Sequence, residues 1–282
     1  MNCLAHYRRV ARGWAIWRIT VFFTVLLALW CPLALAIYLT GNFFGWPQLA
    51  ETAVLLALYG CFTANAWFWG RWVKGWQHPF RAYGLILCRR FFSDALVALV
   101  FGFGLVCVLF GVEILLGWAR FYPTSLAFIT LEGFGVGIGI GLAEELLFRG
   151  WLLAELQTSL PRAKAIMWSS IIFALAHFIK PLPEVLRTSP QFLGLLLLGL
   201  ILGSSRYISR LLQPFPSLGL PLGLHAGLVW GYYIVDVGDL VVPSGRVPEW
   251  VTGIHGNPLS GALGIAILGC LSVYSWLRLR SE

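Results

Sequence analysis

Two adjacent carboxylates and an arginine interrupt a stretch that otherwise has the composition of a membrane-buried helix. The stretch is Gly141-Leu142-Ala143-Glu144-Glu145-Leu146-Leu147-Phe148-Arg149-Gly150. A charged group at bilayer depth costs at least about 2.5–3.5 kcal/mol on insertion scales, so intramembrane ionisable residues are candidates for function. Glu145 and Arg149 are four residues apart, share a helix face and are predicted to pair. Glu144 points about 100° away from Glu145 and is left to face other groups. The alternative is one buried ion cluster with a structural role only.

Two histidines in later apolar segments are candidates to meet Glu144. Glu144 lies about thirteen residues before the turn near 158–163 and His177 about thirteen after it, so both are about 20 Å from that turn along antiparallel helices. His225, between glycines, begins roughly 12 Å from the same membrane face. One carboxylate and two imidazoles have the composition of an acid–base site, or of a three-ligand zinc site with one open position.

The acid–base interpretation predicts a hydrolase. A water shared by Glu144 and His177 can be deprotonated by a general base, which predicts hydrolysis without a covalent intermediate. Other intramembrane chemistries lack their motifs. There is no His-Glu-x-x-His, Gly203-Ser204-Ser205-Arg206 is not Gly-x-Ser-x-Gly, and Val237-Gly238-Asp239 lacks the first glycine of an aspartyl protease pattern.

The composition is that of an integral membrane protein. Hydrophobic residues make up 59% and charged residues only 11% of the 282 residues, against about 25% charged residues in soluble domains. The net charge of +8 is spread between apolar runs and forms no patch for nucleic acid. Anchoring at the anionic cytoplasmic leaflet explains these cations better, so the lipid bilayer is the predicted partner.

The helices that must position these residues can be counted from the apolar runs. Runs of about 20 residues, long enough to span a bilayer, occur near 17–40, 50–70, 94–118, 132–157, 164–181, 190–209, 218–238 and 258–277. The sequence therefore predicts an all-α polytopic bundle of about eight transmembrane helices. It is expected to form one domain over 1–282, with a catalytic core at about 125–240 after N-terminal spans and a cytoplasmic loop in 1–120.

The cations predict the orientation. With eight spans, Arg120, Lys180, Arg187 and Arg246 fall on one side, and the other sixteen of the twenty Lys and Arg residues fall on the opposite side. Lys and Arg accumulate in cytoplasmic segments. Both the N-terminus and the C-terminus are therefore predicted to be cytoplasmic.

Small and polar residues support the packing. Gly133, Gly137 and Gly141 form a stripe that permits close approach of another helix backbone, and Glu144 lies at the end of this stripe with room beside it. Six further acids are interpreted as solvated boundary residues at span ends: Asp94, Glu113, Glu132, Glu155, Asp236 and Asp239. The six cysteines are far apart and indicate no disulfide framework or cysteine metal site.

Three motifs in order resemble a known family. Glu144-Glu145-x-x-x-Arg149, then Phe173-x-x-x-His177, then His225 in a glycine-flanked helix resemble the CPBP family of CAAX-processing and bacteriocin-processing intramembrane proteases, also called Abi proteins. The motifs cover about residues 140–230.

The resemblance implies a fold, an activity and roles for the site residues. The fold is an eight-helix intramembrane endopeptidase with a cavity open toward the cytoplasm, acting on a membrane-proximal or prenylated peptide without a cofactor. Glu144 and His177 would activate the attacking water, and His225 would help to stabilise the oxyanion. Arg149 would orient the carboxylates of Glu144 and Glu145.

One departure keeps alternatives open. The family often has Asn or Asp four residues after the third-motif histidine, where this chain has Val229, and loss of one oxyanion donor can cost about 10²–10³ in rate. One alternative is a non-catalytic membrane binding or immunity protein. Another is a zinc-dependent protease with Glu144, His177 and His225 as ligands. A transporter with a proton relay is disfavoured, because no paired broken helices occur in corresponding halves.

Overall fold

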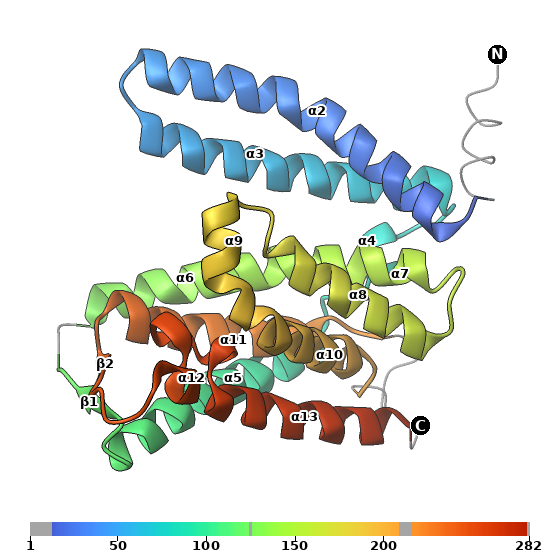
Figure 1. Cartoon of the computed structure of the whole chain (residues 1–282). Coiled ribbons are helices and arrows are strands. Elements are labelled where there is room, and N and C mark those ends of the chain that lie inside the picture. Colours follow the sequence, from blue (N-terminus) through green and yellow to red (C-terminus); the bar gives the residue numbers. More distant parts are fainter. Residues whose placement is uncertain (1–12, 124–125, 209–215, 281–282) are drawn as a thin grey trace, which may run out of the picture. The chain divides into compact units, whose positions relative to one another are not determined.

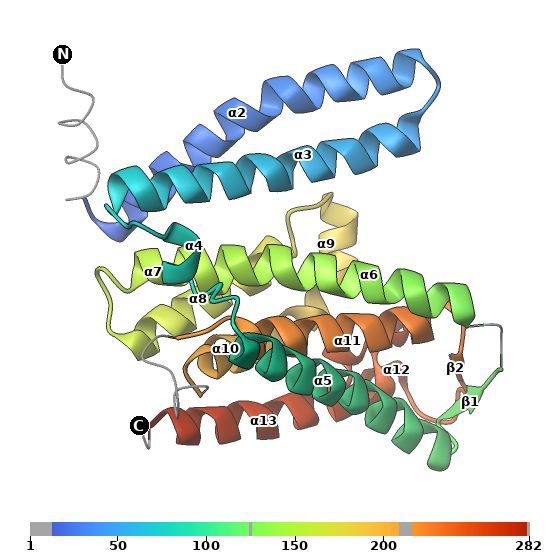
Figure 2. The same cartoon turned by 180° about the vertical axis from the view of Figure 1, so that it is seen from behind.

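The computed structural model of the chain describes residues 13–123, 126–208 and 216–280 and is built almost entirely of helices (Figures 1 and 2). It divides into two compact units, residues 1–82 with 154–159 and residues 83–153 with 160–282. Some residues used in the sequence predictions lie outside the described ranges: Cys3, His6, Arg8, Arg9, Arg12 and Arg210. The described cysteines are free thiols. The prediction of a single transmembrane domain remains a prediction.

The first unit is a helical hairpin with a short extension. It contains α2 (Ala15–Phe43), α3 (Pro47–Phe68), a π-helical segment η1 (Trp69–Val73) and α4 (Pro79–Ala82). The turn between α2 and α3 has a left-handed residue at Gly45, with φ of +74°, which glycine adopts without steric cost. Proline at the first position of α3 has no backbone N–H to leave unsatisfied there.

Glu155, in α7 (Leu153–Leu156), is the centre of a buried ion cluster in this unit. Its carboxylate bonds Arg18 Nε at 2.7 Å, Lys74 Nζ at 2.9 Å and Trp69 Nε1 at 2.9 Å. Burial lowers the pKa of Lys74 from its ordinary value, and the Glu155 carboxylate acts in the opposite direction. The prediction that Glu155 is a solvated boundary residue is wrong, since its side chain is fully buried and paired with cations instead.

The second unit holds the remaining elements. Its helices before the third motif are α5 (Arg89–Leu115), α6 (Ala127–Glu144), the π-helical η2 (Glu145–Leu152), α8 (Arg162–Ala176), α9 (Leu182–Thr188), the 3₁₀ turn η3 (Ser189–Gln191) and α10 (Phe192–Ile208). They are followed by α11 (Gly219–Val237), α12 (Glu249–Thr252), the 3₁₀ turns η5 (Ile254–Gly256) and η6 (Pro258–Ser260), and α13 (Ala262–Arg280). Strands β1 (Ala119–Phe121) and β2 (Val241–Pro243) pair antiparallel.

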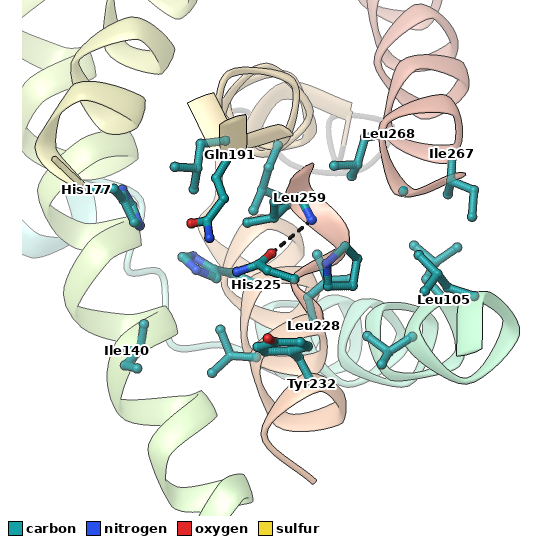
Figure 3. Close-up of a pocket in the computed structure, with 18 of the residues that line it drawn as sticks. Leu105, Ile140, His177, Gln191, His225, Leu228, Tyr232, Leu259, Ile267 and Leu268 are labelled. Carbon is teal, nitrogen blue, oxygen red and sulfur yellow. Dashed lines mark hydrogen bonds between the residues drawn. The ribbon is translucent and has the colours of Figure 1, made fainter. Parts of the chain in front are cut away.

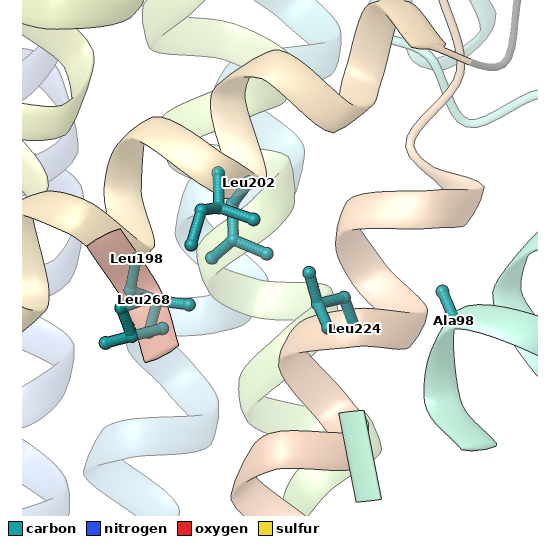
Figure 4. Packing of buried hydrophobic residues seen from close by; sticks show 6 residues of the cluster. Ala98, Leu198, Leu202, Leu224 and Leu268 are labelled. Carbon is teal, nitrogen blue, oxygen red and sulfur yellow. The ribbon is translucent and has the colours of Figure 1, made fainter. Parts of the chain in front are cut away.

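Helix α11 lies at the centre of this unit. It packs against α5 on one side and α6 on another, as Figure 2 shows, and α10 packs against α8, α11 and α13. A buried apolar cluster joins α5, α10, α11 and α13 and contains Ala98, Leu198, Leu202, Leu224 and Leu268 (Figure 4). These contacts fix the position of α11 and therefore of His225.

Six helices are long and apolar enough to cross a membrane within the described residues. They are Ala15–Phe43, Pro47–Val73, Arg89–Leu115, Ala127–Leu156, Leu182–Ile208 and Ala262–Leu279. The other two expected spans are α8 and α11. At 1.5 Å per residue the 15-residue α8 is about 22 Å long, short of the roughly 30 Å hydrocarbon core. Helix α11 includes four glycines, His225 and two tyrosines among its 19 residues, which lowers its hydropathy. The all-α polytopic membrane bundle is confirmed, and the count of eight remains a prediction.

Two more predicted boundary acids are buried. Asp94 and Glu113 are 7% and 3% exposed, so the prediction that both are solvated is wrong. Asp94 pairs with Arg90 at 2.8 Å one turn earlier on α5. By contrast, Glu132, Asp236 and Asp239 are exposed, as expected for residues at helix ends.

Candidate active site

The first motif separates its two glutamates into different environments. Glu145 and Arg149 are both fully buried, and Glu145 Oε1 accepts a hydrogen bond from Arg149 Nη1 at 2.8 Å. This is the predicted pair. The same Oε1 also accepts from His225 Nδ1 at 2.8 Å, which the sequence did not predict. The Glu145 charge is thus balanced by Arg149 and at the same time orients the imidazole of His225.

Glu144 keeps one carboxylate oxygen without a partner. Its side chain is 29% exposed, but its Oε2 is buried and has no hydrogen bond to any part of the chain that the structure describes. The nearest basic atom is His225 Nε2, at 3.7 Å. A buried acceptor without a donor is unfavourable unless another group satisfies it. Glu144 lines a cavity.

A change of helix type lies at the junction of the two glutamates. Helix α6 ends at Glu144, and Glu145 begins the π-helical segment η2, where Leu153 N–H bonds the Phe148 carbonyl five residues back. π-helical turns are rare and often occur at functional sites. The Arg149 carbonyl, within this segment, accepts a hydrogen bond from Arg206 Nη1 of α10. Arg206 was predicted to be a cytoplasmic cation, but it is buried at 4% exposure.

His177 lies directly after the last residue of α8, with a half-buried side chain. Its Nδ1 bonds the Phe173 carbonyl at 2.8 Å. A carbonyl can only accept, so Nδ1 carries the proton, and in the neutral ring Nε2 has the free lone pair. The Phe173 ring contacts both imidazoles, with centroid distances of 4.7 Å to His177 and 6.1 Å to His225.

Helix α8 is fixed to the first motif by polar and aromatic contacts. Ser169 Oγ donates to the Phe148 carbonyl at 2.9 Å, and the Phe148 and Phe173 rings meet edge-to-face at 5.1 Å. The Arg149 guanidinium lies 4.2 Å from the Phe173 ring centroid, a cation–π contact. The structure therefore brings the second motif against the first, as the antiparallel arrangement of the two segments predicted.

Glycines place the third motif. A Cβ on Gly137 would lie 2.7 Å from the Ala226 carbonyl oxygen, and one on Gly141 would lie 3.2 Å from Ala226 Cβ. The predicted stripe is thus a close helix contact, and its partner is the turn of α11 that carries His225. On a second face of α11, a Cβ on Gly223 or Gly227 would lie about 2 Å from a carbonyl oxygen of α5. This double contact sets His225 beside the glutamates.

The three motifs open onto one cavity of about 340 Å³ in the second unit. Figure 3 shows the side chains of His177, Gln191 and His225 gathered at one end of it, with Leu105 and Ile267 at the other. Val229 is in the wall. The remaining lining is largely apolar: Leu105, Val106, Leu109, Phe110, Ile140, Leu195, Leu198, Leu228, Ile267 and Leu268.

A zinc ion at this site would need Glu144, His177 and His225 as ligands. Among the described residues, no group of three His, Cys, Asp or Glu side chains has a geometry that could hold a metal ion. The His225 Nδ1 is committed to Glu145 and the His177 Nδ1 to a backbone carbonyl. One oxygen of Glu144 and the Nε2 atoms of His177 and His225 therefore remain at the cavity without a hydrogen bond among the described residues, and these are atoms that acid–base chemistry could use.

Two lining residues were missed by the sequence predictions. Gln191 precedes α10, and Asn257 lies between η5 and η6, far from the three motifs in the chain. Gln191 stands at the start of the apolar run 190–209 and Asn257 just before the run 258–277, so neither interrupts the middle of a run as Glu144 does. Their arrival at the cavity depends on tertiary packing, which residue spacing does not reveal.

Comparison with known proteins gives one match. Residues 125–231, less than half of the chain, match the family described as type II CAAX prenyl endopeptidase Rce1-like. This segment contains Glu144, Glu145, Arg149, His177 and His225 but ends before Asn257. No curated protein and no solved structure gives a significant match. The segment that carries the three motifs thus matches the Rce1-like type II CAAX prenyl endopeptidase family. This match confirms the resemblance to the CPBP family of intramembrane endopeptidases.

Proposed function

We propose that this integral membrane protein hydrolyses a peptide bond near the membrane by means of a water activated by Glu144 and His177. The observation that supports this most is that the adjacent glutamates have different partners and surroundings. Glu145 Oε1 takes the ion pair with Arg149 and the bond to His225. Each glutamate keeps a buried Oε2 without a donor among the described residues, but only Glu144 lines the cavity. A carboxylate in that position suits a general base.

The reaction follows from the donors and acceptors at the cavity. A water that donates to Glu144 and to His177 Nε2 loses one proton to Glu144 as its oxygen bonds the scissile carbonyl carbon. The carbonyl electron pair moves onto the oxygen, and the resulting oxyanion can accept from protonated His225 Nε2. The C–N bond then breaks as Glu144 returns the proton to the leaving nitrogen, which gives a carboxylic acid and an amine.

Arg149 acts through Glu145 in this proposal. It contacts Glu145 and the carbonyl of Gly199, the latter at 3.3 Å, and within the described residues it forms neither a hydrogen bond nor an ion pair with Glu144. Glu145 in turn holds the Nδ1 proton of His225, which sets the orientation of the ring. Arg149 and Glu145 are therefore positioning residues for His225.

The cavity favours an apolar substrate group. Its volume of about 340 Å³ is within the usual range for ligand sites, and its apolar wall extends away from the polar end. The family description names CAAX prenyl endopeptidases. A membrane-proximal or prenylated peptide is the substrate class that we propose, with the prenyl or another apolar group against the leucines of α5 and α10.

The test is peptide cleavage by the full chain in liposomes. The probe is a fluorogenic farnesylated CAAX peptide, with its unprenylated form for comparison. Glu144→Gln keeps the shape and removes the base, so cleavage is expected to fall at least about 10²-fold while insertion and thermal unfolding stay unchanged. Full activity of Glu144→Gln would refute the proposed mechanism.

Two further arms separate the alternatives. A folded wild-type protein that cleaves neither peptide would support a non-catalytic binding protein. A loss of cleavage on chelation, with zinc found by elemental analysis, would replace the Glu–His base by a zinc-dependent mechanism at the same residues. Cleavage that resists the chelator is the expected result, because the described residues lack a three-ligand cluster.

A further inference from the structure

The cavity is also lined by three polar side chains that the proposed mechanism does not use. They are Gln191, Tyr232 and Asn257. The Tyr232 hydroxyl donates to Asp236 Oδ1 at 3.2 Å, so its only proton is committed. The amides of Gln191 and Asn257 remain as neutral donors at the cavity.

Asn257 is held rigidly by its own turn. Its Oδ1 accepts the Leu259 N–H at 3.0 Å, the bond drawn as the dashed line that ends at Leu259 in Figure 3. Its backbone carbonyl accepts from Ser260 Oγ at 2.8 Å, and Ser260 Oγ also accepts the Ile254 N–H at 2.9 Å. These bonds fix both the backbone and the side-chain amide of Asn257.

Backbone contacts fix this turn against two helices. A Cβ on Gly194, in the first turn of α10, would lie 2.2 Å from the Leu259 carbonyl oxygen. A Cβ on Gly264, in the first turn of α13, would lie 2.1 Å from the Pro258 carbonyl oxygen. Only glycine permits such approaches. The turn that carries Asn257 is therefore clamped between α10 and α13.

The amide of Asn257 keeps its donors free. Its Oδ1 is turned toward the Leu259 N–H, and none of the described residues accepts a hydrogen bond from its Nδ2 amide group. In the same wall Val229, one turn after His225 on α11, carries no polar atom on its side chain. An acyl-transfer site needs preorganised donors for the oxyanion.

We infer that Asn257 Nδ2 supplies the amide hydrogen bond to the oxyanion, as a catalytic residue contributed from beyond the segment that matches the family. This inference rests on the proposed function. Asn257 makes and breaks no covalent bond, and its N–H donates to the carbonyl oxygen as that oxygen becomes negative. Gln191 is the weaker donor, because no hydrogen bond among the described residues fixes its amide.

The experiment distinguishes loss of the amide donor from disruption of the turn that carries Asn257. Asn257→Asp and Asn257→Ser each keep a side-chain oxygen that can accept the Leu259 N–H, and each removes the amide donor, one with added charge and one without. In the liposome assay both are expected to lower kcat about 10²–10³-fold with little change in KM, since the bond forms only in the transition state. Thermal unfolding is expected to stay near wild type.

A rescue variant tests the chemistry itself. Val229→Asn places an amide in the same cavity wall. In the Asn257→Ser background it is expected to raise kcat at least about tenfold above that of Asn257→Ser alone. Gln191→Met serves as the comparison at the cavity and is expected to lower kcat by less than Asn257→Ser does.

The outcomes distinguish this inference from the proposed function. An active wild type whose Asn257→Asp and Asn257→Ser variants retain wild-type kcat would overturn the role of Asn257 and leave the protease intact. A loss that appears only in KM, or only together with unfolding, would overturn it as well. Wild-type protein that cleaves no better than Glu144→Gln would overturn the proposed function and this inference together.

Discussion

At the scale of single residues, the adjacent glutamates Glu144 and Glu145 differ in burial and in partners. Glu145 is fully buried against Arg149 and His225, and Glu144 is partly exposed at the cavity with a free oxygen. Breaking a buried ion pair by removing one partner costs about 3–5 kcal/mol, because the other charge is left uncompensated. Substitution of Glu145 should therefore lower mainly the stability, and substitution of Glu144 mainly the activity.

Glu145→Gln is predicted to lower the free energy of unfolding by about 3–5 kcal/mol, because Arg149 remains buried without its counter-charge. Glu144→Gln is predicted to change it by less than about 1 kcal/mol. Thermal unfolding of both purified variants in detergent measures the difference. Equal stability of the two variants would contradict the assignment of Glu145 as the ion-pair partner.

The sequence predicted much of this site. The spacing of Glu145 and Arg149 predicted their pair, and the equal distances of Glu144 and His177 from their turn predicted that α8 packs against the first motif. The bond from His225 to Glu145 was missed, because it depends on how closely α11 approaches α6. Asn257 was missed for a related reason, since a turn far along the chain reaches the cavity only through the glycines that clamp it.

At the scale of elements, α11 depends on glycines for its position. Its own glycines face α5, and the α6 glycines pack against a second face of it. A side chain on either face forces a shift of the helix that carries His225. Misplacement of a catalytic group by about 1 Å can cost about 10² in rate, so these positions affect activity without touching substrate.

Gly223→Ala is predicted to lower both stability and cleavage. Its Cβ would lie 2.0 Å from the Ala95 carbonyl oxygen, and overpacking of this kind costs about 1–3 kcal/mol. The matched control is Gly139→Ala on α6, where no atom lies within 4 Å of the added Cβ. Thermal unfolding and kcat of both variants test this. A Gly223→Ala protein as stable and active as Gly139→Ala would show that the close contact does not position α11.

The elements were predicted unevenly. The small-residue stripe of α6 was identified from spacing alone, because glycines at every fourth position share one helix face. The π-helical segment was not, since a stretch of Leu, Phe and Trp is compatible with either helix type. Helix α8 ends earlier than its apolar run, at Ala176, because hydropathy does not show where the backbone turns away.

At the scale of the whole molecule, the asymmetry of the cations predicts the orientation in the membrane. An even number of crossings returns the chain to the side on which it started, and this holds for eight spans and for six. Sixteen of twenty cations on one side predicts that both ends of the chain are cytoplasmic. Buried cations such as Arg18, Arg149 and Arg206 are stabilised by local partners and contribute less to this signal.

Reporter tags at the two ends measure this orientation. In sealed vesicles with the cytoplasmic face inside, both tags are predicted to resist added protease until the membrane is permeabilised. A tag at Arg120, between α5 and α6, is predicted to be cleaved without permeabilisation. Protection of only one terminal tag would mean an odd number of crossings and would refute the predicted orientation.

The two closely packed faces of α11 have a consequence for how such a protein can diversify. Substitutions there displace the helix, so change is restricted to its third face, where Leu228, Val229 and Tyr232 border the cavity. Altered side chains on that face would reshape what the chamber admits while the scaffold stays still. New peptide preferences are therefore open to this architecture through a few positions, without any remodelling of the bundle.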